Sequence, residues 1–187
     1  MTNWRIRMML AELAIVVCLG GCSSPGGNLA ELPQTADTSS YRFGPGDRLE
    51  IRVLGAEELN GQYIVQDDGT IRILMVGIVP AANLTPEELE KRIAERLRAG
   101  KLISNPQVSA SVAVYRPFYI LGEVARPGGY PYASGMRVLS AVAAAQGYTY
   151  RANQDYVIVT RSGANNRADI LSSIRPDDII RVPERYF

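Results

Sequence analysis

The chain has 187 residues, with 20 basic and 19 acidic side chains and no histidine. The absence of histidine excludes Ser–His and Cys–His nucleophilic catalysis and histidine metal sites, and the balance of charge gives no electrostatic footprint for nucleic acid. Both cysteines lie near the N-terminus, so the rest of the chain has no thiol for a disulfide or a cysteine zinc site.

The N-terminal segment has the layout of a secretory signal peptide that ends on a cysteine. A start with two arginines precedes an apolar run over 13–19, and two glycines precede Cys22. A cationic start, an apolar core and small residues before the break define such a peptide, and this run is too short to span a bilayer. The ending resembles the lipobox of bacterial lipoproteins, in which the cysteine is lipid-modified. We therefore predict a signal peptide over 1–21 and lipidation of Cys22, in preference to a buried N-terminal helix.

The stretch after this cysteine differs in composition from the rest of the chain. Residues 23–40 are rich in Ser, Gly and Pro and show no apolar period. Such a composition is typical of a flexible linker, so we expect a tether over 22–40. The folded part would run from Tyr41 to Phe187, a length that suits one domain or two small ones.

The first half of the folded part is predicted to contain several strands. Their alternating apolar residues place them over 41–43, 49–54, 63–66, 70–76 and 107–114. Asp67-Asp68-Gly69 lies between two of these strands and predicts a hairpin turn, because Asp-Gly suits the backbone of tight turns. We prefer this interpretation to a pair of catalytic carboxylates.

One helix in this half is specified by both of its ends. Thr85 stands at the N-cap, Pro86 at the first helical position and Glu88 at the third, which together form a capping box. Gly100 supplies the C-terminal stop. Helical spacing predicts one buried stripe, formed by Leu89, Ile93 and Leu97.

The second half follows a similar plan. Its predicted elements are a strand over 118–124, a turn and return over 126–132, a helix over 136–146, and strands over 155–160 and 178–182. Arg116-Pro117 stands between the halves, so we expect two domains, over 41–115 and 116–187. Each half has strands, one helix and more strands, which predicts an α+β fold.

In this order the segments resemble the Wza-like family of outer-membrane polysaccharide export lipoproteins. The part similar to the family's export domain comprises Tyr41-Arg-Phe-Gly-Pro-Gly-Asp-Arg-Leu-Glu-Ile-Arg-Val53, Asp68-Gly-Thr-Ile71, the helix after Thr85, and Asn105-Pro-Gln-Val108. The part similar to its soluble-ligand-binding β-grasp module comprises Ile120-Leu-Gly-Glu-Val-Ala-Arg-Pro-Gly128, Leu139-Ser-Ala141 and Ala145-Gln-Gly147. The chain has one such module, whereas larger members of the family have two.

The resemblance implies a component of an exopolysaccharide or capsule export machine, with no catalytic residue, cofactor or metal. It implies a ring-shaped homo-oligomer in the periplasm at the outer membrane. The ring would conduct the polysaccharide substrate and dock on an inner-membrane copolymerase. The sequence identifies neither the polysaccharide nor the number of subunits in the ring.

Four tyrosines are candidate contacts for a glycan or for a subunit interface, namely Tyr130, Tyr132, Tyr148 and Tyr150. Tyrosine serves both purposes, because its ring is apolar and its hydroxyl is polar. Two rival functions stay open. One is a monomeric periplasmic lipoprotein that binds a small ligand or glycan. The other is a lipid-anchored carbohydrate-active enzyme, which would need two converging carboxylates.

The position after the lipidated cysteine indicates where the protein is delivered. Ser23 follows Cys22, and in many enteric-type lipoproteins an aspartate there marks retention in the inner membrane. The sequence therefore predicts a lipid anchor in the outer membrane, facing the periplasm. Two or more acyl chains hold a protein stably at a membrane.

We expect Cys22→Ser to accumulate as an unprocessed precursor, because the variant has no thiol for lipid attachment. Gel mobility and membrane fractionation measure this. Normal processing of the variant together with outer-membrane fractionation would contradict the predicted anchor.

Overall fold

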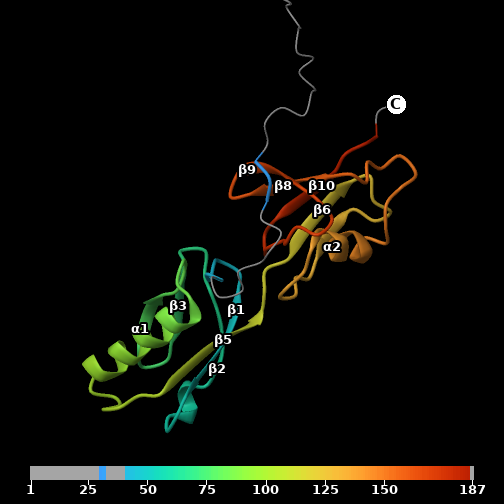
Figure 1. Ribbon diagram of the computed structural model, residues 1–187. Coiled ribbons are helices and arrows are strands. Elements are labelled where there is room, and N and C mark those ends of the chain that lie inside the picture. Colours follow the sequence, from blue (N-terminus) through green and yellow to red (C-terminus); the bar gives the residue numbers. More distant parts are fainter. Residues whose placement is uncertain (1–29, 33–40, 186–187) are drawn as a thin grey trace, which may run out of the picture.

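The structure is a computed structural model that describes residues 30–32 and 41–185. Within these residues it has two α-helices, one short 3-10 helix and ten strands arranged in three sheets. The elements form two halves, each with its own apolar core, joined where β5 leads into β6 (Figure 1). The prediction of an α+β fold is confirmed.

The first half contains a three-stranded antiparallel sheet and a separate two-stranded one. The three-stranded sheet has the order β2-β1-β5, formed by Gly61–Ile64, Arg48–Val53 and Val108–Val114. The two-stranded sheet is formed by β3 (Thr70–Ile73) and β4 (Gly77–Pro80). The 3-10 turn η2 (Glu57–Leu59) connects β1 to β2. The helix α1 (Pro86–Ala99) buries Leu89, Ile93 and Leu97 against the same core as β1, so its predicted stripe is confirmed.

Two strand predictions in this half were wrong. Residues 41–43 form no strand, because Phe43 pairs alone with the segment before α1: its amide donates to Leu84 O at 2.9 Å, and its carbonyl accepts from Asn83 N at 2.8 Å. The run 70–76 is not one strand, because Met75 has a φ of 62° and turns the chain back into β4. Neither the turn at Met75 nor β4 was predicted.

The predicted turn over 67–69 is present, but it does not join a hairpin. The Gln66 and Thr70 backbones close the turn at 2.8 Å, and the Asp68 carboxylate accepts from both the hydroxyl and the amide of Thr70. These hydrogen bonds lower the pKa of Asp68. The strands on either side pair elsewhere, β2 with β1 and β3 with β4. Asp68 is therefore a turn residue.

The capping box of α1 is confirmed. The amide of Glu88 donates to the Thr85 hydroxyl at 3.2 Å, and the amide of Thr85 donates to the Glu88 carboxylate at 2.8 Å. That backbone hydrogen bond lowers the pKa of Glu88, and the charge of Arg42 adds to the effect. Arg42 also forms an ion pair with Glu88 at 2.9 Å.

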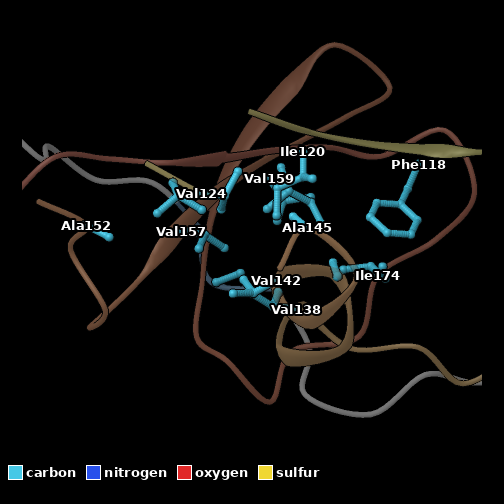
Figure 2. Packing of buried hydrophobic residues seen from close by; sticks show 14 of the residues in the cluster. Phe118, Ile120, Val124, Val138, Val142, Ala145, Ala152, Val157, Val159 and Ile174 are labelled. Atoms are coloured by element: carbon cyan, nitrogen blue, oxygen red, sulfur yellow. The ribbon is translucent and has the colours of Figure 1, made fainter. Parts of the chain in front are cut away.

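The second half is built on one five-stranded sheet of order β7-β6-β10-β8-β9, in which β6 and β10 are parallel. These strands are β6 (Phe118–Gly122), β7 (Gly128–Tyr130), β8 (Val157–Arg161), β9 (Ala164–Ala168) and β10 (Ile179–Val182). The helix α2 (Val138–Ala144) packs on one face of this sheet. Figure 2 shows Val138 and Val142 of the helix on one side of the core, with Ile120 and Val159 of the sheet opposite. The helix is shorter than the predicted 136–146, and β9 was not predicted.

A short segment from the predicted tether lies against this sheet. Ala30–Leu32 runs beside β9: the amide of Leu32 donates to Arg167 O at 3.0 Å, and the amide of Arg167 donates to Ala30 O at 2.9 Å. The Leu32 side chain is buried in the core of the second half. The tether prediction for 22–40 did not include this contact.

We expect Thr85→Ala to lower the free energy of unfolding by about 1 kcal/mol, because the variant loses the N-cap hydrogen bond. Thermal or urea unfolding measures the change. Ser140→Ala, at an exposed position of α2, is the control and should change stability by no more than about 0.5 kcal/mol. An unchanged Thr85→Ala variant would mean that the capping box does not stabilise α1.

Candidate functional site at the junction of the two halves

The junction between the halves is organised around a fully buried carboxylate. Asp47 is 0% exposed and ends the turn that precedes β1. Its Oδ2 accepts from the Tyr41 hydroxyl at 2.6 Å and from the Gly44 amide at 2.8 Å. Its Oδ1 accepts from the amide and Nε of Arg116 at 3.2 and 3.3 Å. A buried carboxylate is stable only when charge and hydrogen bonds are supplied in this way.

The glycine turn next to Asp47 makes room for the arginine. A Cβ on Gly44 would lie 2.8 Å from the guanidinium carbon of Arg116, closer than real Cβ contacts come. Gly46 has a φ of 91°, in the region that favours glycine. The two glycines therefore seat a guanidinium beside a carboxylate, and the segment is a structural turn.

A second buried carboxylate lies on the other side of the junction. Asp178 is 1% exposed and receives two hydrogen bonds from Arg161, at 2.9 and 2.7 Å, in a bidentate arrangement. The Arg175 amide adds a third at 2.7 Å. Arg116 also reaches the neighbouring Asp177 at 3.7 Å. The linker arginine is thus paired with carboxylates from both halves.

Three tyrosines cross the junction in edge-to-face contact. The Tyr115 ring lies 5.1 Å from Tyr41 at 84° and 5.3 Å from Tyr132 at 75°. Such pairs are favoured because the positive edge of one ring meets the negative face of the next. Burial, followed by the hydrogen bond to Asp47, raises the pKa of Tyr41 well above its ordinary value. Its hydroxyl therefore remains a protonated donor at physiological pH.

A cleft of about 350 Å³ opens beside these groups, at the lower end of the range for small-ligand sites. Its lining includes Tyr41, Arg42, Asn83, Tyr115, Tyr132, Ser134, Arg161, Ser162, Arg175 and Asp177. The two buried carboxylates are held by guanidinium and amide donors, and Asp47 also by the Tyr41 hydroxyl. The cleft has the size and the polar lining to hold a small polar ligand.

Within residues 30–32 and 41–185, no group of three or more Asp, Glu, His or Cys side chains could hold a metal ion. The same part of the chain contains no helix with the length and hydropathy needed to cross a membrane. The predicted lipidation site, Cys22, lies outside the described residues.

The four candidate tyrosines occupy different environments. Tyr132 lines the cleft. Tyr130 stacks on Phe118 at 5.9 Å and donates its hydroxyl to Arg126 O at 2.7 Å. Tyr148 packs against the core of the second half, whereas Tyr150 is 90% exposed. Tyr130 and Tyr132 pack against that same core, but among the described residues no ring contact joins any two of the four, and a glycan contact stays a prediction for each.

The sequence did contain signals for the junction, although its residues were not identified as a site. Asp47 follows a Gly-Pro-Gly turn and directly precedes a buried strand, where an unpaired carboxylate would be unfavourable. Arg116 was identified only as a boundary residue. Its partnership with Asp47 joins positions 69 residues apart, a pairing that no local pattern reveals.

Comparison with known proteins gives two family matches in succession. Residues 35–113 match the family described as polysaccharide biosynthesis/export protein, and residues 117–168 match the SLBB domain. The chain is also 30% identical over 202 residues to the exopolysaccharide production protein ExoF of Rhizobium meliloti (strain 1021). That alignment includes 94% of this chain and 47% of ExoF, so the chain spans about half the length of this relative.

We expect Asp47→Asn to lower the free energy of unfolding by about 2–3 kcal/mol, because the partly buried Arg116 loses its buried counter-charge and keeps only the more distant, exposed carboxylate of Asp177. Glu50→Gln is the matched control, since Glu50 forms only an exposed pair with Arg52, and its cost should stay below about 1 kcal/mol. Urea unfolding compares the two. Equal effects would contradict a special role for Asp47.

Proposed function

We propose that the chain, whose residues 35–113 match the polysaccharide biosynthesis/export family, is a non-enzymatic component of a machine that exports an exopolysaccharide or capsule polymer. The observation that carries this proposal is the succession of an export domain and an SLBB domain along the chain. The paired carboxylates of the junction support a role without catalysis, because Asp47 and Asp178 each accept several hydrogen bonds that hold them in place.

We further propose that the protein works as a ring-shaped homo-oligomer, anchored through lipidated Cys22 on the periplasmic face of the outer membrane. The edge strands of both halves support assembly. β2 and β5 lie at the edges of the first sheet and β7 at one edge of the second, and edge strands carry unpaired backbone groups that partner strands or subunits cover. A heterologous contact repeated by rotation closes such subunits into a ring.

The remaining steps of export would belong to partners. The conduit would pass the polysaccharide outward and dock on an inner-membrane copolymerase. The name of the relative, exopolysaccharide production protein, supports an exopolysaccharide as the transported polymer. The rival function, a monomeric ligand-binding lipoprotein, would use the junction cleft without assembling.

Deleting the gene should stop polymer from appearing outside the cell while polymer synthesis in membrane preparations continues. The reason is that a conduit is needed for transport and not for bond formation. Secreted and cell-associated sugar are measured in the deletion strain and in the same strain carrying the gene on a plasmid. Unchanged secretion would contradict the export function.

The mass of the lipidated protein in detergent distinguishes the ring-shaped export component from the monomeric ligand-binding lipoprotein. We expect a closed oligomer at micromolar concentration, measured by mass photometry or sedimentation. A monomer across this range, together with saturable binding of a small glycan, would favour the ligand-binding lipoprotein.

A further inference from the structure

The five-stranded sheet of the second half has one face without a covering layer among the described residues. Its inward residues, such as Ile120 and Ile180, pack against α2, and the alternate residues point to the opposite face. The strand register aligns these outward residues in two rows. The rows are Tyr119–Ile179–Thr160–Asn165 and Leu121–Arg181–Ile158–Arg167.

This outward face, defined by those two rows, is rich in large apolar side chains. Tyr119, Leu121 and Ile179 are 44%, 40% and 39% exposed, and they adjoin one another on the paired strands β6 and β10. Ile158 continues the apolar surface on β8, in the same row as Leu121. Contiguous exposed apolar residues on a sheet indicate an interaction surface.

The first half provides an internal comparison, because it too packs a helix on one face of a sheet. Its outward residues at the centre of the sheet are polar or small: Glu50, Arg52, Gln62, Ser109 and Ser111. One end of the same face carries the exposed apolar residues Ile64 and Val114 on either side of Arg48. In the second half, by contrast, both aligned rows of the outward face carry large apolar side chains.

Arg181 lies in the middle of the outward face, between Leu121 and Ile158. Within the part of the chain that the structure describes, it forms no ion pair with a carboxylate. Arginine and tyrosine among aliphatic residues are typical of the centre of a protein–protein interface. The partner should therefore offer an apolar side chain flanked by carboxylates.

The chain itself carries a surface of this kind at the far end of the first half. We call it the tip, and it consists of Leu54, Glu57 and Glu58. Leu54 is 77% exposed, and both glutamates are exposed in η2. The tip is held in place, because Ala56 and Leu59 next to it are buried in the core.

The tip and the outward face of one subunit cannot meet within that subunit. β1 runs from Arg48, beside Val114 and the linker, to Val53, beside Val108, so the tip lies about 20 Å farther from the junction than Arg48. Figure 1 shows η2 at the opposite end of the molecule from β6 and β10. A contact between these surfaces therefore joins two copies.

We propose that the outward face of one copy binds the tip of a second copy, with Leu54 among the apolar side chains and Glu57 or Glu58 paired with Arg181. The contact is heterologous, because each copy contributes a different surface. This inference rests on the proposed assembly into a homo-oligomer and names the surfaces that build it.

The test compares full-length, processed protein in detergent by mass photometry. Leu54→Asp changes the tip and Arg181→Glu changes the outward face, while Ser111→Glu adds a charge to the polar face of the first half as the matched control. We expect the wild type and Ser111→Glu to assemble. We expect the two interface variants, Leu54→Asp and Arg181→Glu, to be monomers at the micromolar concentration at which the wild type assembles. Their melting temperatures should equal that of the wild type.

Mixing the two defective variants gives the sharpest readout. The Leu54→Asp copy keeps an intact face and the Arg181→Glu copy keeps an intact tip, so an equal mixture should form dimers and stop there. No dimer in the mixture would overturn the proposal. Normal assembly of both single variants would also overturn the proposed contact between tip and outward face. That result would not contradict the proposed ring, which would then form through other surfaces.

Two other results would point to different occupants or a different function. If Arg181→Glu assembles normally but loses binding of the exported polymer, the outward face meets polysaccharide and the proposal fails. A wild-type protein that stays monomeric in detergent would overturn both this contact and the proposed ring.

Discussion

The buried carboxylate of Asp47 is the constraint on which the arrangement of the two halves depends. Because it lies entirely away from water, it requires donors and a counter-charge. Tyr41 and Gly44 provide donors from within the first half, and Arg116 provides the charge from the linker. The contact that supplies the counter-charge to the Asp47 carboxylate therefore also fixes the position of Arg116, from which the second half begins. A glycine at 44 and the ring contacts of Tyr115 follow from the same packing.

Elements with strong local signals could be predicted from the sequence, and those that depend on long-range pairing could not. The helix after Thr85 carries its cap, its first-turn proline and its apolar stripe within 13 residues, and all three are present. β9 has the sequence Ala-Asn-Asn-Arg-Ala, which contains no strong strand former, and it exists because β8 pairs with it. The turn at Met75 escaped prediction because β-branched and apolar residues surround it.

The candidate site shows the same limit. Tyr132 was singled out from the sequence and does line the junction cleft, but the other three candidate tyrosines do not. The residues that organise the cleft, Asp47 and Arg116, belong to different sequence blocks, so their pairing depends on the fold. Leu32 likewise falls in a stretch whose composition is typical of a linker, yet it is buried against β9. Composition cannot report a contact made by a single side chain.

The central claim, that the Asp47–Arg116 junction holds the two halves in one arrangement, can be tested by a distance measurement. The chain from Ser23 onward contains no cysteine, so spin labels can be placed on cysteines introduced at Glu95 in α1 and Gln154 ahead of β8, both exposed. Pulsed electron resonance then gives the distance distribution between the halves. The account predicts one narrow distribution for the otherwise unaltered chain and a broad one after Arg116→Ala. An identical narrow distribution in both proteins would contradict it.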